Sequence, residues 1–324
     1  MRPSVPPSLF SIPFGLAGLA TAWVYAGRRD LVPAAIGDVL AALGGLVWLV
    51  VFAAYVRSLA QRGIGTLARD FADPVIGPFT ALIPTSALLL VIDGIVPHAP
   101  DLGRVVVDVL IVVIVLLAGW STGQWMHGTL DMTKLHPGYF LPSVAGGLLA
   151  AIGAAAVDQP RLAEVLFGLG VLSWLLLGSM ILARLFFGPP LPPALMPTRA
   201  IQVAPAAVAT LAYLAMHGER IDGVVAGLAG YGLVMVIAQL RLVPAFLALD
   251  FGLPSWSFTF SWAAVASVGL HWLAIEQPGG WKAFSFVLLA AVTALVGWIA
   301  ARTVVAVAGH RLLPPAPLPV PVHA

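Results

Sequence analysis

The sequence predicts an all-α integral membrane protein in which ten transmembrane helices form five tandem helical hairpins. Of the 324 residues, 60% are hydrophobic and 9% are charged, whereas a soluble domain is about 25% charged. The mean hydropathy is +1.00. Apolar runs long enough to cross about 30 Å of hydrocarbon recur along the chain. Two sequence markers also repeat with nearly one period, which predicts a duplicated two-helix unit.

Ten apolar runs separated by short polar loops predict the individual spans. Their expected bounds are 9–26, 33–56, 78–93, 104–127, 138–157, 161–186, 199–217, 221–248, 254–273 and 281–308. We expect a single transmembrane domain over residues 1–311 and a proline-rich C-terminal tail over residues 312–324.

The first repeated marker is a proline near the middle of the first four odd-numbered spans, at Pro13, Pro84, Pro142 and Pro205. The second is found in the even spans, where a charged residue near the start is followed about 20 positions later by a basic one. That spacing is about 29 Å along a helix, close to the thickness of the hydrocarbon core. Both markers recur at intervals of roughly 60 to 70 residues, which favours five hairpins.

The odd spans carry the features of a solvated pathway. A proline inside a transmembrane helix frees backbone carbonyls that lipid cannot satisfy, and small residues such as Gly15 and Ser261 accompany the prolines. The fifth odd span has an aromatic residue, Phe260, where the others have their break. We therefore expect an inner ring of five kinked odd helices around a central pore, and an outer ring of five even helices.

Charged side chains are absent from the central parts of the odd spans, and Asp93 and His271 lie near span ends. Coupling to protons usually requires a titratable group at membrane depth, so the pattern favours a passive path over a pump. Helix ends and hydroxyls would attract an anion without trapping it. Arg241 either attracts anions at the inner mouth or is a snorkelling residue at a helix end.

The few charged residues indicate an orientation and exclude several functions. Ten of the 16 lysines and arginines fall on one side of the predicted membrane, which predicts a multi-pass protein of the cell inner (plasma) membrane with both termini in the cytoplasm. No basic patch indicates a nucleic-acid partner. We expect no metal, cofactor or catalytic residue, because the chain has no cysteine and no hydrolase or zinc-protease motif. His136, which precedes Pro137, is expected to cap a helix or lie on the surface.

A series of short motifs resembles the tellurite-resistance and dicarboxylate transporter family from about residue 9 to residue 308. In order they are Phe10-Ser-Ile-Pro-Phe-Gly-Leu-Ala17, Asp73-Pro74, Ala81-Leu-Ile-Pro84, His136-Pro-Gly-Tyr-Phe-Leu-Pro142, Ala204-Pro205, Gly230-Tyr-Gly232, Leu240-Arg-Leu242 and Trp256-Ser-Phe-Thr-Phe260. Each motif alone is a weak signal, and their order along the chain makes the resemblance specific.

The resemblance implies a homotrimer with one pore of quasi-fivefold symmetry in each protomer. It also implies conduction of small inorganic anions, nitrate and chloride among them, through a gate formed by a phenylalanine of the ninth helix. The matching position is Phe260, and Ser261 stands where relatives often have glycine. The alternative is a secondary transporter or exporter of dicarboxylates or oxyanions such as malate or tellurite.

Overall fold

The computed structural model describes residues 5–63, 65–128, 130–309 and 311–312, so residues 313–324 of the predicted tail lie outside the described residues. The described part of the chain is all-helical. Within it, ten helical segments are long and apolar enough to cross a membrane, which confirms the predicted number of spans. Most bounds differ from the predicted ones by a few residues, and the last span, Trp281–Ala308, agrees with its prediction.

The even spans are long, continuous helices with exposed surfaces. They are α2 (Ala34–Arg62), α5 (Pro100–Met126), α7 (Pro160–Phe187), α9 (Gly223–Leu247) and α11 (Trp281–Ala308). Only 11% to 28% of the residues in their apolar windows are buried, as expected for helices whose sides face lipid or a neighbouring chain. The predicted loop after residue 56 is partly helical, because α2 runs on to Arg62 and α3 (Gly65–Ala72) follows it.

The odd spans are buried and have two parts, a short 3₁₀ segment followed by an α-helix. The pairs are Pro7–Phe10 with α1 (Ser11–Arg28), Gly77–Ala81 with α4 (Leu82–Gly94), Pro193–Val203 with α8 (Ala204–His217), and Leu253–Trp256 with α10 (Ser257–Glu276). The third odd span starts with a 3₁₀ turn, Pro137–Tyr139, and a π-helical turn, Leu141–Ala145, ahead of α6 (Gly146–Ala156). Between 50% and 78% of the residues in these windows are buried.

The repeated prolines lie at these junctions and not in the middle of continuous helices. Pro13 and Pro84 are third in α1 and α4, and Pro205 is second in α8. A proline costs little there because the first turn has no intrahelical partner for its missing N–H. The fifth odd span changes from 3₁₀ to α between Trp256 and Ser257 without a central proline. The prediction that Phe260 replaces the break is therefore wrong, because this span has both.

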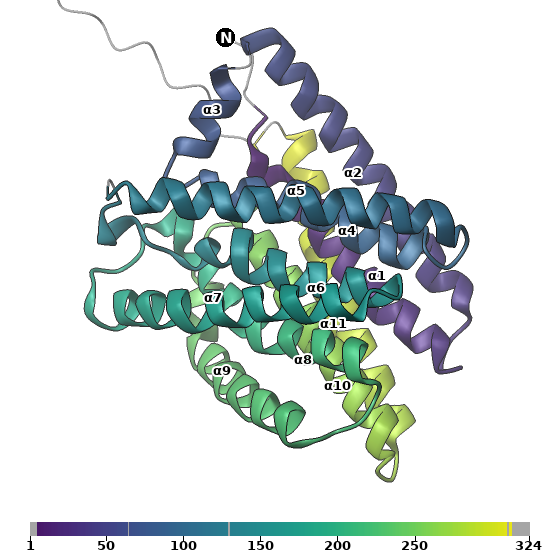
Figure 1. Ribbon diagram of the computed structural model, residues 1–324. Helices are drawn as coiled ribbons and strands as arrows, with labels where there is room; N and C mark the ends of the chain where they lie inside the picture. Colours follow the sequence, from purple (N-terminus) through teal and green to yellow (C-terminus); the bar gives the residue numbers. More distant parts are fainter. Residues whose placement is uncertain (1–4, 64, 129, 310, 313–324) are drawn as a thin grey trace, which may run out of the picture.

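Helix contacts link the odd spans to one another and to their even partners. Each odd helix packs on the even helix that follows it, and α6 lies between α5 and α7 in Figure 1. The odd helices also contact one another in sequence, α1 with α4, α4 with α6, α6 with α8, α8 with α10, and α10 with α1. In the third hairpin the approach is close enough that a Cβ on Gly147 would lie 2.7 Å from the backbone nitrogen of Gly170.

Candidate functional site

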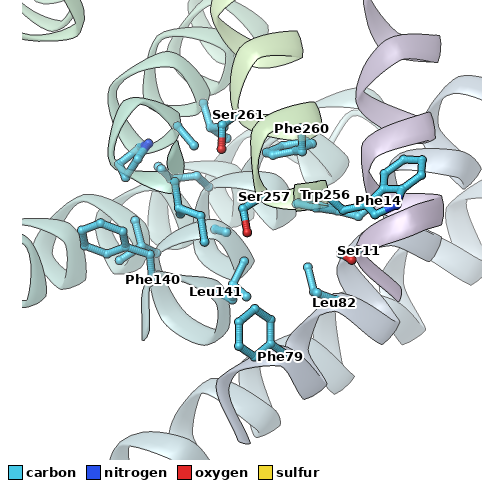
Figure 2. Close-up of a pocket in the computed structure, with 17 residues that line it drawn as sticks. Ser11, Phe14, Phe79, Leu82, Phe140, Leu141, Trp256, Ser257, Phe260 and Ser261 are labelled. Atoms are coloured by element: carbon cyan, nitrogen blue, oxygen red, sulfur yellow. The ribbon is translucent and has the colours of Figure 1, made fainter. Parts of the chain in front are cut away.

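A small cavity of about 40 Å³ lies where the 3₁₀ segments of the odd spans meet their α-helices. Every odd span contributes to its wall, for example through Ser11, Phe79, Leu141, Pro205 and Ser257. The volume is enough for a few water molecules. The wall is mostly apolar, and Figure 2 shows hydroxyl oxygens of serines from α1 and α10 among the side chains around it. Among the described residues, none with a charged side chain lines this cavity.

A larger cavity of about 350 Å³ lies along the later turns of the same five helices. Each of the five odd spans contributes to its wall, for example through Thr21, Asp93, Ile152, Leu211 and His271. Its charged lining residues are Arg28, Arg29, Asp93 and Glu219. The two cavities therefore differ in character, because the smaller one is uncharged and the larger one carries both signs of charge.

Phe260 of α10 lines both cavities. The ring is only 8% exposed and stacks on Phe14 of α1, with ring centroids 3.8 Å apart and planes inclined by 24°. Gly18 provides the space for this position, because a Cβ there would lie 3.0 Å from Cδ2 of Phe260. Val208 of α8 also lines both cavities. Phe260 and Val208, which lie in both walls and which we call the partition, are thus apolar and carry no charge.

The ring of Phe258, two residues before Phe260, lies in a different environment from the ring of Phe260. It packs edge to face on Phe246 of α9, with centroids 4.9 Å apart, and lines a surface groove that includes residues of α9 and α11. Phe258 lines neither of the two cavities. Residues two apart on a helix are about 200° apart around its axis, which accounts for the opposite directions of Phe258 and Phe260.

The other residues predicted to line the pathway fall into two groups. Pro205 and Ser261 line the smaller cavity. Pro13, Gly15, Pro84 and Pro142 line neither cavity, although all four are buried in the odd spans beside them.

Gly15 and Arg241 differ in their surroundings, although neither lines a cavity. Gly15 packs against Thr259 and Trp256 at the start of α10. Arg241 is exposed on α9 and also lines neither cavity.

The charged groups of the larger cavity were not assigned to the pathway from the sequence. Asp93 is 5% exposed and approaches Thr21 of α1, and the His271 ring stacks on Tyr25 with centroids 3.5 Å apart. Arg29 forms an ion pair with Glu219. Among the described residues, the smaller cavity is therefore lined by no titratable side chain, whereas the larger one is lined by several. The available signal in the sequence was that Asp93 and His271 lie near span ends, because the wall of the larger cavity includes other residues at those ends, such as Arg28.

His136 is a buried helix cap beside the smaller cavity, so a cap is the correct alternative and a surface position is wrong. Its ring is fully buried, lies parallel to Phe79 and accepts a hydrogen bond at Nδ1 from the backbone N–H of Gly138, 3.1 Å away. Protonated Nδ1 would face that N–H with a second hydrogen. Burial lowers the pKa of His136 from 6.5 to about 4, so the ring is neutral near pH 7.

The protein is expected to lose stability as the pH falls from about 6.5 to about 4. In that pH window the imidazole of His136 is protonated in the unfolded chain but stays neutral in the folded protein. The free energy of unfolding therefore rises with pH. The full difference for this one residue is about 3 kcal/mol. His136→Asn keeps an acceptor for the Gly138 N–H and removes the titration. Unfolding temperatures in detergent should depend less on pH in this window for the variant, and identical curves would contradict the assignment.

The fold and the cavities define a multi-pass membrane protein whose buried helices enclose two cavities, as in channels and transporters. The sequence matches the family described as voltage-dependent anion channel (SLAC1) over residues 4–304. The chain belongs to this family, whose activity is anion transport across a membrane and not enzymatic catalysis.

A curated relative agrees with this assignment. The chain is 28% identical over 286 residues to the tellurite resistance protein TehA homolog of Haemophilus influenzae, an alignment that covers 87% of this chain and 86% of the relative. The resemblance inferred from the motifs is confirmed.

Proposed function

We propose that the protein is a gated channel that conducts small monovalent anions, chloride and nitrate among them, down their gradient. The observation that carries this proposal is that Phe260 lines both cavities, so an anion that moves from one cavity to the other must pass its ring. In this proposal the five odd helices form the inner ring around the pathway and the five even helices form the outer ring. The closed series of contacts from α1 through α10 back to α1 supports that arrangement.

The smaller cavity supports anion selectivity without a fixed positive charge. All five odd α-helices begin beside it, so the positive ends of their dipoles are directed toward one place. The hydroxyls of Ser257 and Ser261 add hydrogen-bond donors. Such partial charges attract an anion and still release it, whereas the full charge of an arginine side chain in the wall would hold the anion too long.

We also propose where the channel lies in the cell, how it assembles and how it is oriented in the membrane. The exposed apolar surfaces of the even helices are suited to the lipid of the cell inner membrane and to contact with other copies in a homotrimer. With both termini in the cytoplasm, the smaller cavity lies on the cytoplasmic side of Phe260 and the larger one on the outer side.

The second candidate is a secondary transporter of dicarboxylates or oxyanions. It is favoured by Asp93 and His271, because titratable groups in a buried cavity are the parts that proton coupling requires.

Ion-substitution electrophysiology on the whole protein in planar bilayers separates the two candidates. For a channel, the reversal potential is expected to follow the chloride or nitrate gradient and to stay fixed when a pH gradient is added. A reversal potential that shifts with the pH gradient would overturn the channel proposal and support a proton-coupled transporter. Gluconate in place of chloride is the control for leak, since a large organic anion should not pass the same narrow route.

A further inference from the structure

The carboxyl group of Asp93 is buried in the wall of the larger cavity, near the end of α4. Its Oδ2 lies 2.6 Å from Oγ1 of Thr21 on α1. Among the described residues, no lysine, arginine or histidine nitrogen lies within 4.0 Å of the carboxyl oxygens. A buried carboxylate without a cationic partner is costly, and here it lies beside a route proposed for anions.

The hydrogen atoms around Thr21 allow two arrangements. Oγ1 of Thr21 lies 2.6 Å from Asp93 and 3.0 Å from the carbonyl oxygen of Ala17, one turn earlier in α1. A hydroxyl has one hydrogen to donate. When Asp93 is ionised, Thr21 donates to it and the Ala17 carbonyl loses that partner. When Asp93 carries a proton, it donates to Thr21, which then donates to Ala17, and both hydrogen bonds are made. The site therefore accommodates both protonation states.

The proton on Asp93 determines the net charge of the cavity wall. Arg29 is neutralised by its ion pair with Glu219. The remaining charged residues that line the cavity are Arg28 and Asp93. With Asp93 ionised and His271 neutral, these two charges cancel. With Asp93 protonated, the positive charge of Arg28 is left without an opposing charge in the wall, and an anion is attracted.

Other titratable groups lie on helices that pack against α4 or that line the cavity. They are Tyr25 and Arg28 on α1, Arg29 directly after it, Asp38 on α2, Asp101, Arg104 and Asp108 on α5, Glu219 after α8 and His271 on α10. Asp38 lies 3.7 Å from His98, and Asp108 accepts a hydrogen bond from Gln159. Neither Asp38 nor Asp108 lines the cavity. His271 is thus a second group in the cavity wall, besides Asp93, whose protonation would change the charge of the cavity.

We propose that Asp93 determines whether an anion can occupy the larger cavity: the cavity admits an anion when Asp93 carries a proton and excludes it when Asp93 is ionised. The inference rests on the proposed channel function and adds a specificity-determining residue to it. The proton stays on the protein during conduction. The rate of anion passage should therefore depend on pH, whereas the reversal potential should not.

The experiment measures chloride and nitrate currents in planar bilayers at matched pH on both sides, with Phe260→Ala as the background so that the aromatic partition does not limit the current. At pH values where Asp93 is mostly ionised, the current in this background should fall by about tenfold per pH unit, because the protonated fraction falls by that factor. Adding Asp93→Asn should give a high current that is independent of pH. Asp93→Glu retains a titratable group and should restore the pH dependence.

Two controls make the result specific. Asp101→Asn makes the same chemical change on an exposed residue of α5 and should leave the pH dependence unchanged. His271→Gln should retain the fall in current if Asp93 is the responsible group. The inference is overturned if Asp93→Asn keeps the pH dependence of its background, or if His271→Gln alone abolishes it. If Phe260→Ala carries no anion current at any pH, the channel proposal itself fails, which is a different outcome.

Discussion

Phe260→Ala is expected to raise the anion current well above that of the wild-type protein, on the order of tenfold or more. Phe260 lines both cavities, its ring stacks on Phe14, and we propose that this ring blocks passage between the cavities. Alanine removes the ring and joins the cavities. A barrier lowered by about 1.4 kcal/mol already corresponds to a tenfold gain in rate. Single-channel and macroscopic currents in planar bilayers, with matched amounts of protein, are the measurement.

Phe258→Ala is the matched control for this experiment. It removes the same side chain from the same helix two residues earlier, where the ring packs on Phe246 outside both cavities. Its current should equal that of the wild type. Equal currents from wild type and Phe260→Ala, in folded protein, would show that Phe260 is not the barrier. Equal gains from both variants would point to a general loosening of α10.

Gly15→Ala is expected to destabilise the folded protein by about 1–3 kcal/mol, the usual cost of overpacking. A Cβ at position 15 would overlap Oγ1 of Thr259 and would lie 2.7 Å from Cβ of Thr259 and 2.8 Å from Cε3 of Trp256. Neither neighbour moves easily. Trp256 is 2% exposed and donates a hydrogen bond from Nε1 to Thr303, and Thr259 donates to the Trp256 carbonyl.

The measurement is the unfolding temperature of the purified protein in detergent, with Gly45→Ala as its matched control. Gly45 lies in α2, and a Cβ there would meet no atom within 4 Å. Alanine favours a helix over glycine by about 1 kcal/mol, so Gly45→Ala should be neutral or slightly stabilising. A wild-type unfolding temperature in Gly15→Ala would mean that α1 and α10 are less closely packed at this point than the structure indicates.

The ten spans were predictable because the length and hydropathy of an apolar run decide whether it crosses a bilayer. The junctions within the odd spans were predictable only in part. Proline is a local signal, and it indicated the irregular backbone around Pro13, Pro84, Pro142 and Pro205. The same change of helix type between Trp256 and Ser257 has no proline inside α10, so the repeated marker did not indicate it.

The charged wall of the larger cavity depends on contacts between residues far apart in the chain. Asp93 and Thr21 are 72 positions apart, and no periodic pattern places one beside the other. The sequence located Asp93 near the end of a span but could not show that α1 and α4 bring it to a cavity. His136 was predictable as a cap because it precedes proline, whereas its burial against Phe79 comes from the packing of two separate spans.

The stack of Phe14 on Phe260 has a consequence for biosynthesis. One ring belongs to the first membrane segment and the other to the ninth, so nearly the whole polypeptide separates them. During translation the first hairpin enters the bilayer without the aromatic contact that completes the partition. In the proposed channel the permeability barrier is therefore assembled late, and we expect a chain truncated before α10 to insert most of its helices without sealing the pathway.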